Sequence, residues 1–283
     1  MTYVPPLPDV ILEPLVRLAL LEDLSPAGDI TSDTSLAQET SLRALLRARE
    51  AGVVAGLDAA LLALRMVDPT VAVRVVRADG VSFEADDVIA ELSGPARSIL
   101  MVERTMLNFL GHLSGIATLT REFVRAVAGT RARITCTRKT TPGLRALEKR
   151  AVRLGGGFNH RHSLADAVLI KDNHVAAAGG VRAALERARA VAGHMRVIEI
   201  EVDTLAQLQE VLPLRPHCVL LDNMTPDELR EAVALAGGQV VLEASGNVRL
   251  QNVAQIAATG VDYISAGALT HSARRLDLGL DAV

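Results

Sequence analysis

The residues most able to do chemistry concentrate between positions 137 and 174. The segment TRKTTPGLRALEKRAVRLGGGFNHRHSLADAVLIKDNH holds eight Lys or Arg against three acidic residues, a net charge of +5 in a chain whose net charge is −3. Converging cations bind carboxylates or phosphates, because each charge-assisted hydrogen bond to an anion contributes roughly 1.5–3 kcal/mol. Several cations exceed what one monoanion needs, so the segment predicts a polyanion or two anionic ligands.

Some of these cations are expected to be plain surface residues. Apolar residues between positions 144 and 154 recur at helical spacing, which predicts a solvated helix face made of Arg145, Lys149 and Arg153. The other cations lie at expected strand ends or in loops: Arg138, Lys139, His160, Arg161 and Lys171. The pair His160 and His162 has a spacing that metal hydrolases use, but the intervening Arg161 opposes a metal cation there.

Carboxylates and small residues follow later in the chain. In VIEIEVD (197–203) acidic and apolar residues alternate, so one set faces an interior where carboxylates must be paired, metal-bound or hydrogen-bonded. Glu201, with Asp222 on the next apolar run, therefore predicts ligands for Mg²⁺ or for sugar hydroxyls. The alternative is an ion pair with Lys139 or Lys171. The Gly/Ser-rich segments EASGN and SAGALT predict either tight turns or a phosphate site made of Ser245, Gly246, Asn247 and Gly267.

The elements that must position these residues form strand–helix repeats. From residue 133 onward, six short apolar runs alternate with helical segments, a pattern that predicts a parallel sheet and suggests a barrel. The runs are RITC (133–136), DAVLIKD (166–172), VIEIEVD (197–203), HCVLLDN (217–223), VVLEASG (240–246) and VDYISAG (261–267). Helix caps are expected at Asp203-Thr204 and Thr225-Pro226. Parallel strands would gather the candidate residues at their carboxyl ends.

The first hundred residues lack this alternation. Their mixture of helical and strand-like stretches predicts a separate α+β domain that ends near Gly94-Pro95. A long helix from about Ser98 to Ala128 is expected to follow, and its interior GHLSG favours a break.

The composition argues against several classes of function. The near-neutral net charge gives no general affinity for nucleic acid, and the few aromatic residues (four Phe, two Tyr and no Trp) argue against base-stacking platforms. No run reaches the length of a membrane span, and the N-terminus lacks the pattern of a signal peptide. Cys136 and Cys218 lie in apolar runs typical of reduced core thiols. These features predict a soluble cytoplasmic protein.

Six motifs, in order, closely resemble the quinolinate phosphoribosyltransferase family, also called carboxylating nicotinate-nucleotide pyrophosphorylases. They are TRKTTPGLRALEK, GGGFNHRHSLADAVLIKDNH, EIEVD, LLDNM, LEASGN and VDYISAGALTHSA. The resemblance covers essentially the whole chain, because it extends to GDITSD (28–33), AREAGVVAGL (48–57) and ERTMLNFLGHLSGIATLT (103–120). It implies that quinolinate and phosphoribosyl pyrophosphate react, with Mg²⁺, to give nicotinate mononucleotide, pyrophosphate and CO₂, a step of NAD biosynthesis.

The resemblance also implies a fold and an assembly. The expected fold is an open α/β barrel of about seven parallel strands, residues 113–283, preceded by a smaller α+β domain, residues 1–112. The strand beyond the six apolar runs is expected near Phe158–Arg161. The expected assembly is a homodimer with shared active sites, in which the N-terminal domain of one subunit covers the barrel mouth of the other; assembly beyond the dimer stays open.

Site roles follow from the matched motifs. The quinolinate carboxylates are expected to be held by Arg138, His160 and Arg161, with Arg104 reaching them from the partner subunit. Lys139 and Lys171 would sit between quinolinate and pyrophosphate, while Glu201 and Asp222 would bind ribose hydroxyls and Mg²⁺; these four are the expected catalytic residues. The 5′-phosphate would be bound by Ser245, Gly246, Asn247 and Gly267, with His271 close by.

Other interpretations remain beside this one. A relative associated with molybdenum-transport gene clusters shares the TRKT and HR motifs, but the intact KDNH and EASGN favour the quinolinate enzyme. A nicotinate phosphoribosyltransferase would handle one carboxylate and need fewer cations. A Schiff-base aldolase would use Lys171 as nucleophile, which borohydride inactivation would reveal. A non-catalytic phosphate-binding barrel would leave Glu201, Asp222 and the cations unexplained.

Overall fold

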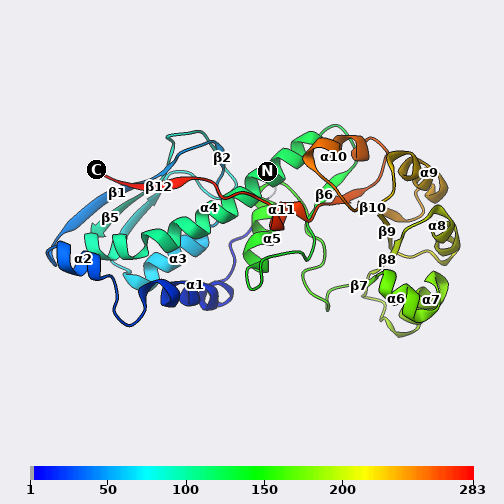
Figure 1. The fold of residues 1–283 in the computed structure, drawn as a ribbon, viewed down its shortest axis with the longest axis horizontal. Coiled ribbons are helices and arrows are strands. Elements are labelled where there is room, and N and C mark those ends of the chain that lie inside the picture. Colours follow the sequence, from blue (N-terminus) through cyan, green and yellow to red (C-terminus); the bar gives the residue numbers. More distant parts are fainter. Residues whose placement is uncertain (1–2) are drawn as a thin grey trace. The chain divides into compact units, whose positions relative to one another are not determined.

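The computed structural model describes residues 3–283, which form two compact units (Figure 1). Unit 1 contains the residues up to Arg121 together with 141–156 and 272–283, and unit 2 contains 122–140 and 157–271. The two units are therefore interleaved along the chain. The predicted domains, 1–112 and 113–283, are continuous segments, and that division stays a prediction.

Unit 1 is built on a four-stranded antiparallel sheet in the order β12–β1–β5–β3. Its strands are β1 (Ser41–Ala48), β3 (Ala72–Val75), β5 (Val88–Pro95) and β12 (Leu278–Ala282), and a small second sheet pairs β2 (Gly52–Val53) with β4 (Ser82–Phe83). The helices are α1 (Asp9–Leu24), α2 (Ile30–Ser35), α3 (Leu57–Val67), most of α4 (Ala96–Ala126) and α5 (Arg145–Leu154). The predicted α+β character is confirmed, but β12 returns from the far end of the chain.

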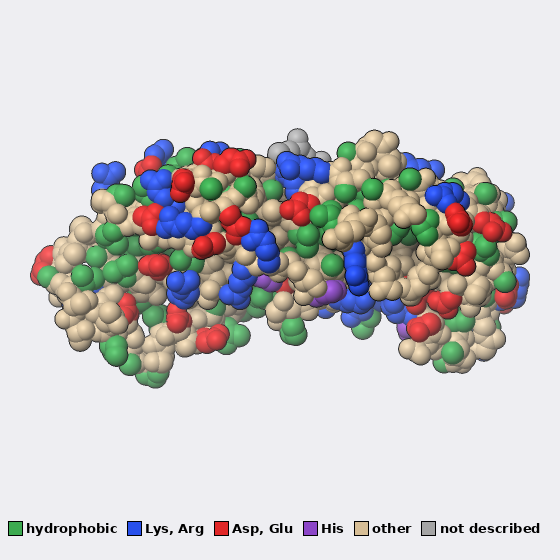
Figure 2. Space-filling model, turned by 45° about the horizontal axis from the view of Figure 1, so that its top comes forward, with side chains coloured by type: hydrophobic (Ala, Val, Ile, Leu, Met, Phe, Trp, Pro, Cys, Tyr) green, Lys and Arg blue, Asp and Glu red, His purple; other side chains and the backbone are tan. Residues whose placement is uncertain are grey.

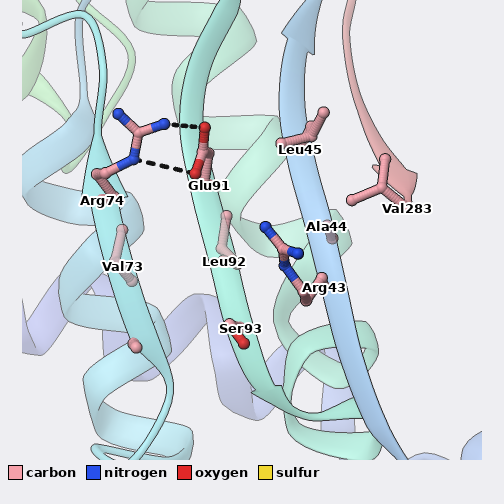
Figure 3. A pocket seen from close by; sticks show the side chains of 10 residues that line it. Arg43, Ala44, Leu45, Val73, Arg74, Glu91, Leu92, Ser93 and Val283 are labelled. Atoms are coloured by element: carbon pink, nitrogen blue, oxygen red, sulfur yellow. Dashed lines mark hydrogen bonds and ion pairs between the residues drawn. The ribbon is translucent and has the colours of Figure 1, made fainter.

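One face of this sheet carries a shallow pocket of about 190 Å³. Figure 3 shows Arg74 of β3 ion-paired with Glu91 of β5 there, while Arg43 of β1 and Val283 contribute to the lining. Alternate residues of β1 on the other face are buried: Ala44, Leu46 and Ala48. This alternation is that of an antiparallel sheet with one core face and one solvated face.

Helix α4 is continuous, so the break expected at GHLSG is wrong. Its glycines allow a close backbone approach of the segment 274–276: a Cβ on Gly115 would overlap the Arg274 carbonyl oxygen, and one on Gly111 would lie 2.8 Å from the Leu276 carbonyl oxygen. The packing that these glycines permit offsets a propensity cost of about 1 kcal/mol each.

Helix α5 contradicts the expectation of a solvated basic face. Lys149 is only 1% exposed, and Arg145 and Arg153 are half-buried. Glu148 of the same helix is fully buried; it accepts hydrogen bonds from His112 Nε2 (2.8 Å) and from the Thr141 backbone N–H (3.2 Å). Helical spacing identifies one apolar stripe, but it does not reveal how many sides of the helix the rest of unit 1 covers.

Unit 2 contains a parallel sheet in the order β6–β11–β10–β9–β8–β7. All six predicted runs form strands: β6 (Arg133–Thr135), β7 (Val168–Ile170), β8 (Ile198–Val202), β9 (Cys218–Asp222), β10 (Val241–Ser245) and β11 (Tyr263–Ser265). Between and after them lie α6 (Asp172–Ala178), α7 (Val181–Val191), α8 (Leu205–Val211), η1 (Leu212–Leu214), α9 (Pro226–Ala236), α10 (Leu250–Ala257) and α11 (Ala268–His271). Both predicted caps are confirmed, because the hydroxyls of Thr204 and Thr225 accept helix N–H groups.

The number of strands corrects the expectation of about seven, and a barrel is not confirmed. Within residues 3–283 the expected strand near Phe158–Arg161 is reduced to one bridge, in which Phe158 pairs in parallel with Thr135. The Phe158 N–H donates to the Ile134 carbonyl (2.8 Å), but three residues later the Arg161 N–H donates to the ring of His160 (2.8 Å). That side-chain acceptor takes a donor that a longer strand would use in its ladder.

The surface and the thiols agree with the composition. On the face drawn in Figure 2, acidic and basic side chains are intermixed. Of the two predicted core thiols, Cys136 is buried and Cys218 is partly buried. Across residues 3–283 no helix is both long and apolar enough to cross a membrane.

Candidate active site

Most predicted site residues lie in unit 2, at or just beyond the carboxyl ends of its parallel strands. Arg138 and Lys139 follow β6, Lys171 follows β7, Asp222 ends β9 and Ser245 ends β10. Carboxyl ends of parallel strands share one edge of the sheet, which is where α/β enzymes place their ligands. Arg104 is the exception, because it lies exposed on α4 in unit 1.

Three carboxylates gather at this edge. Oxygen atoms of Glu201, Asp203 and Asp222 lie within 4.8 Å of one another. Lys171 Nζ lies 2.7 Å from Glu201 Oε2, although Glu201 is only 8% exposed. Both alternatives raised by the sequence therefore occur together: an ion pair, and a cluster of oxygen ligands of the kind that Mg²⁺ prefers. Asp203 was not among the predicted site residues, although it lies two residues after Glu201 in VIEIEVD and so on the same side of the run.

The loops after β9 and β10 are packed against each other. Gly246 has a φ of 94°, and a Cβ there would lie 2.8 Å from the backbone nitrogen of Asn223. Asn247 Nδ2 donates to Asn223 Oδ1 (3.1 Å). Only glycine fits at position 246, because it combines a left-handed backbone with this close approach. Helix α10 begins three residues after Asn247, so its first N–H groups lie close in sequence to this turn.

A second small-residue turn holds Lys139. A Cβ on Gly267 would lie 3.0 Å from His271 Nε2 and 3.1 Å from Lys139 Cδ, so these three residues are neighbours. The Thr270 hydroxyl donates to the Lys139 carbonyl oxygen (2.7 Å). Thr270 was not predicted, but it lies in the same SAGALTHS segment and is buried. The turn after β11 thus fixes the backbone of a predicted catalytic lysine.

Arg138 and Arg161 form a pair of like charges. Burial, and then the positive charge of Arg138, lower the pKa of Arg161. The Arg161 guanidinium donates to the Ala167 carbonyl oxygen (3.0 Å), while its buried Nε has no hydrogen-bond partner among the residues that the structure describes. Because the charge of Arg138 acts on Arg161, the two cations repel each other, and a ligand with more than one negative charge would offset this repulsion.

Beside this pair lies a buried network that the sequence analysis missed. His160 Nε2 is 3.0 Å from Glu199 Oε2 and 3.8 Å from Glu243 Oε1, and the two glutamates are 7% and 5% exposed. Burial, and then the Glu199 carboxylate, raise the pKa of Glu243 to about 7. Burial likewise raises the pKa of the Cys218 thiol, which donates to Glu199 Oε1 (3.2 Å). The available signal was the position of Glu199 two residues before Glu201, on the same side of β8.

Comparisons with known proteins decide the family. Residues 29–114 match the family described as quinolinate phosphoribosyl transferase, N-terminal domain, and residues 116–281 match its C-terminal domain. The chain belongs to the quinolinate phosphoribosyltransferase family. The family predicted from the motifs is thereby confirmed, and so is the prediction that the protein is an enzyme.

The match to individual members of the quinolinate phosphoribosyltransferase family spans whole chains. A nicotinate-nucleotide pyrophosphorylase [carboxylating] from Mycobacterium leprae is 47% identical over 271 residues, which cover 94% of this chain and 95% of the relative. A probable enzyme of the same name from Bacillus subtilis is 43% identical, covering 95% and 93%. The solved nicotinate-nucleotide pyrophosphorylase of Francisella tularensis superposes with a TM-score of 0.95 at 38% identity over 100% of both chains.

Proposed function

We propose that this chain transfers the phosphoribosyl group of phosphoribosyl pyrophosphate to quinolinate and removes one carboxylate as CO₂. The products would be nicotinate mononucleotide and pyrophosphate, which makes the reaction a step of de novo NAD biosynthesis. The observation that carries the proposal is the match of residues 29–114 and 116–281 to the two quinolinate phosphoribosyl transferase domains, and the cations Arg138 and Arg161 suit a ring with two adjacent carboxylates. Relatives named as carboxylating or decarboxylating enzymes of this reaction support it.

Substrate positioning is assigned to the cations. Arg138 and Arg161 would grip the two carboxylates, and Arg104 of the partner subunit would reach the same ligand. His160 was also expected to hold them, but both of its ring nitrogens are hydrogen-bonded to protein groups, so we assign it to the support of Arg161. This clamp would aim the pyridine nitrogen at C1 of the ribose, and such positioning contributes several kcal/mol to a reaction between two substrates. Lys139 and Lys171 would lie between the two substrates, where their charge stabilises the departing pyrophosphate.

We assign the carboxylate cluster of Glu201, Asp203 and Asp222 to binding of the ribose hydroxyls and of Mg²⁺. Glu201 and Asp222 would accept hydrogen bonds from the ribose hydroxyls and, with Asp203, supply oxygen ligands that fit Mg²⁺. When bound, Mg²⁺ would neutralise part of the charge that develops on pyrophosphate. Lys171 offsets the Glu201 charge through its 2.7 Å ion pair. The 5′-phosphate is assigned to Ser245, Gly246, Asn247 and Gly267, with His271 beside them.

The chemistry then proceeds by two bond exchanges. As the C1–O bond to pyrophosphate breaks, its electron pair leaves with pyrophosphate and C1 becomes cationic, and the pyridine nitrogen donates its lone pair to C1. The ring is now a cation, which stabilises the electron pair left on the ring carbon when the adjacent carboxylate departs as CO₂. A proton from water completes the product. No side chain needs to act as a nucleophile.

The first test is an isotope assay. The purified protein, incubated with Mg²⁺, phosphoribosyl pyrophosphate and quinolinate labelled in its 2-carboxylate, is expected to release labelled CO₂ only when all components are present. Chelation of Mg²⁺ is expected to reduce this release at least tenfold, because the pyrophosphate charge is then less well neutralised. Nicotinate in a parallel tube is the control and should give no mononucleotide. Absence of CO₂ release would refute the proposal and favour the molybdenum-associated relative.

We also propose that the enzyme is a homodimer with shared active sites. Helix α1 supports this, because it buries Leu12, Val16 and Leu20 on one side yet leaves Val10 and Leu18 76% and 66% exposed on others. In unit 2 a groove of about 640 Å³ beside β7 is lined by Leu164 and Val191, which are 70% and 87% exposed, and by basic residues: Arg161, Arg187 and Arg196. Exposed apolar surface of this kind commonly marks a protein–protein interface.

Replacing Leu18 with glutamate is expected to convert the dimer to monomers. A buried interfacial leucine contributes roughly 1.5–3 kcal/mol, and a carboxylate in its place adds a desolvation penalty. Light scattering after gel filtration should give about twice the 30.0 kDa chain mass for the wild type and about one chain mass for the variant. Val76→Glu, at another exposed apolar residue of unit 1, is the matched control and should remain dimeric. A dimeric Leu18→Glu protein would show that α1 lies outside the interface.

A further inference from the structure

We propose that Glu199 is a positioning residue for quinolinate. Its carboxylate fixes the imidazole of His160, and His160 in turn holds the backbone of Arg161, so that the Arg161 guanidinium faces the substrate. The inference deepens the proposed function and rests on it, because it assumes that Arg161 binds a quinolinate carboxylate.

Both ring nitrogens of His160 are engaged by protein groups. The Arg161 N–H donates to Nδ1 (2.8 Å), so Nδ1 carries no proton and Nε2 carries it. The Nε2–H then donates to Glu199 Oε2 (3.0 Å). A histidine whose two nitrogens are fixed in this way has one tautomer and one ring orientation. The Arg161 backbone N–H is therefore held by the ring of His160, and that ring is in turn held by the Glu199 carboxylate.

The carboxylates themselves are held rigidly. Glu199 lies on β8, Cys218 on β9 and Glu243 on β10, three neighbouring strands of the unit 2 sheet. The Cys218 thiol donates to the second oxygen of Glu199 (3.2 Å), and the Ser265 hydroxyl bonds to Glu243. Glu243 Oε1, buried and without a hydrogen-bond partner among the described residues, lies 3.8 Å from His160 Nε2. The Nε2–H is thus flanked by two carboxylates mounted on rigid strands.

Burying the Glu199 carboxylate here is costly, and a purely structural contact would not need it. A neutral pair could satisfy one imidazole N–H without the desolvation penalty of a charged group. The negative charge has a use in this place, because Glu199 opposes the effects of burial and of Arg138, which lower the pKa of Arg161. Glu199 therefore serves Arg161 twice, through the ring of His160 and through its charge.

Steady-state kinetics test the inference in the full-length enzyme. Glu199→Ala is expected to raise KM for quinolinate tenfold or more while KM for phosphoribosyl pyrophosphate stays within twofold, because only the carboxylate clamp is disturbed. Glu199→Gln keeps an acceptor for His160 and should recover most of the loss, leaving a two- to fivefold rise. Glu231→Gln, at an exposed carboxylate of the same unit, should match the wild type. Equal changes in both KM values would overturn the inference in favour of a general structural role.

Nitrogen NMR of the labelled histidines supplies a readout that does not depend on turnover. The wild type should show His160 as the Nε2–H tautomer, assigned by its disappearance in His160→Gln, and Glu199→Ala should give a mixture of tautomers. If Glu199→Ala does not fold, Glu199→Gln is used instead, and wild-type KM values in Glu199→Gln would contradict the inference. An unchanged His160 tautomer in a folded Glu199→Ala protein would also contradict the inference. If the wild type does not convert quinolinate but His160 shows the expected tautomer, the proposed function is refuted, whereas the His160 hydrogen-bond network is supported.

Discussion

Exchanging Arg161 for lysine is expected to lower kcat/KM for quinolinate on the order of 100-fold, mostly through KM. Lysine keeps the charge but loses the planar fork that grips a carboxylate with two hydrogen bonds. Each such bond contributes roughly 1.5–3 kcal/mol, and about 3 kcal/mol of lost binding corresponds to two powers of ten. Lysine also cannot reproduce the guanidinium contact to the Ala167 carbonyl while holding a ligand.

The measurement is a pair of saturation curves, one for each substrate. KM for phosphoribosyl pyrophosphate should change little, because the residues assigned to that substrate are separate from the Arg138–Arg161 pair. Arg182→Lys is the matched control: it makes the same exchange at an exposed arginine of the same unit, on α7 and outside the groove. Wild-type kinetics for Arg161→Lys would remove Arg161 from the substrate site and, with it, the argument from paired guanidinium groups.

The repeating part of the fold was predictable because its signals are local. Each strand of the unit 2 sheet is a short apolar run that ends in polar residues, and helices with caps such as Thr225-Pro226 begin soon after. Strand ends then place Lys171 and Asp222 at a common edge without any knowledge of distant contacts. The alternation in VIEIEVD likewise predicts the charged interior that holds Glu201.

The features that could not be predicted depend on contacts between residues that are far apart in the sequence. Strand β12 pairs with β1 although the two are more than 200 residues apart in the chain, so no window of sequence reveals the pairing. The glycines of α4 suggest a break when the helix is considered alone, because the segment 274–276 that packs against them is far away in the sequence. Glu199 belongs to the site because Cys218 and His160 converge on it, and that convergence exists only in the folded sheet.

Burial of charge on α5 leads to the largest expected effect on stability. Arg150 is 9% exposed; it donates to Asp79 Oδ2 (2.6 Å) and to the Pro5 carbonyl oxygen (3.0 Å), and it lies 3.3 Å from Asp58 Oδ2. Replacing Arg150 with methionine is expected to lower the free energy of unfolding by about 3–5 kcal/mol, because it leaves two buried carboxylates without their cation. Chemical denaturation monitored by circular dichroism would measure the loss.

The pH dependence of that loss identifies its cause. Burial raises the pKa of Asp79, and Arg150 opposes the rise, so the variant should raise this pKa further. A carboxyl whose folded pKa lies above its unfolded value binds protons more tightly when folded, so stability falls as the pH rises between the two values. The deficit of Arg150→Met should therefore shrink at acidic pH, and adding Asp79→Asn should recover part of it at neutral pH. Arg65→Met, which breaks an exposed ion pair with Asp9, should have little effect. A deficit that is independent of pH and of Asp79→Asn would mean that the packing of the Arg150 side chain, rather than its charge, stabilises unit 1.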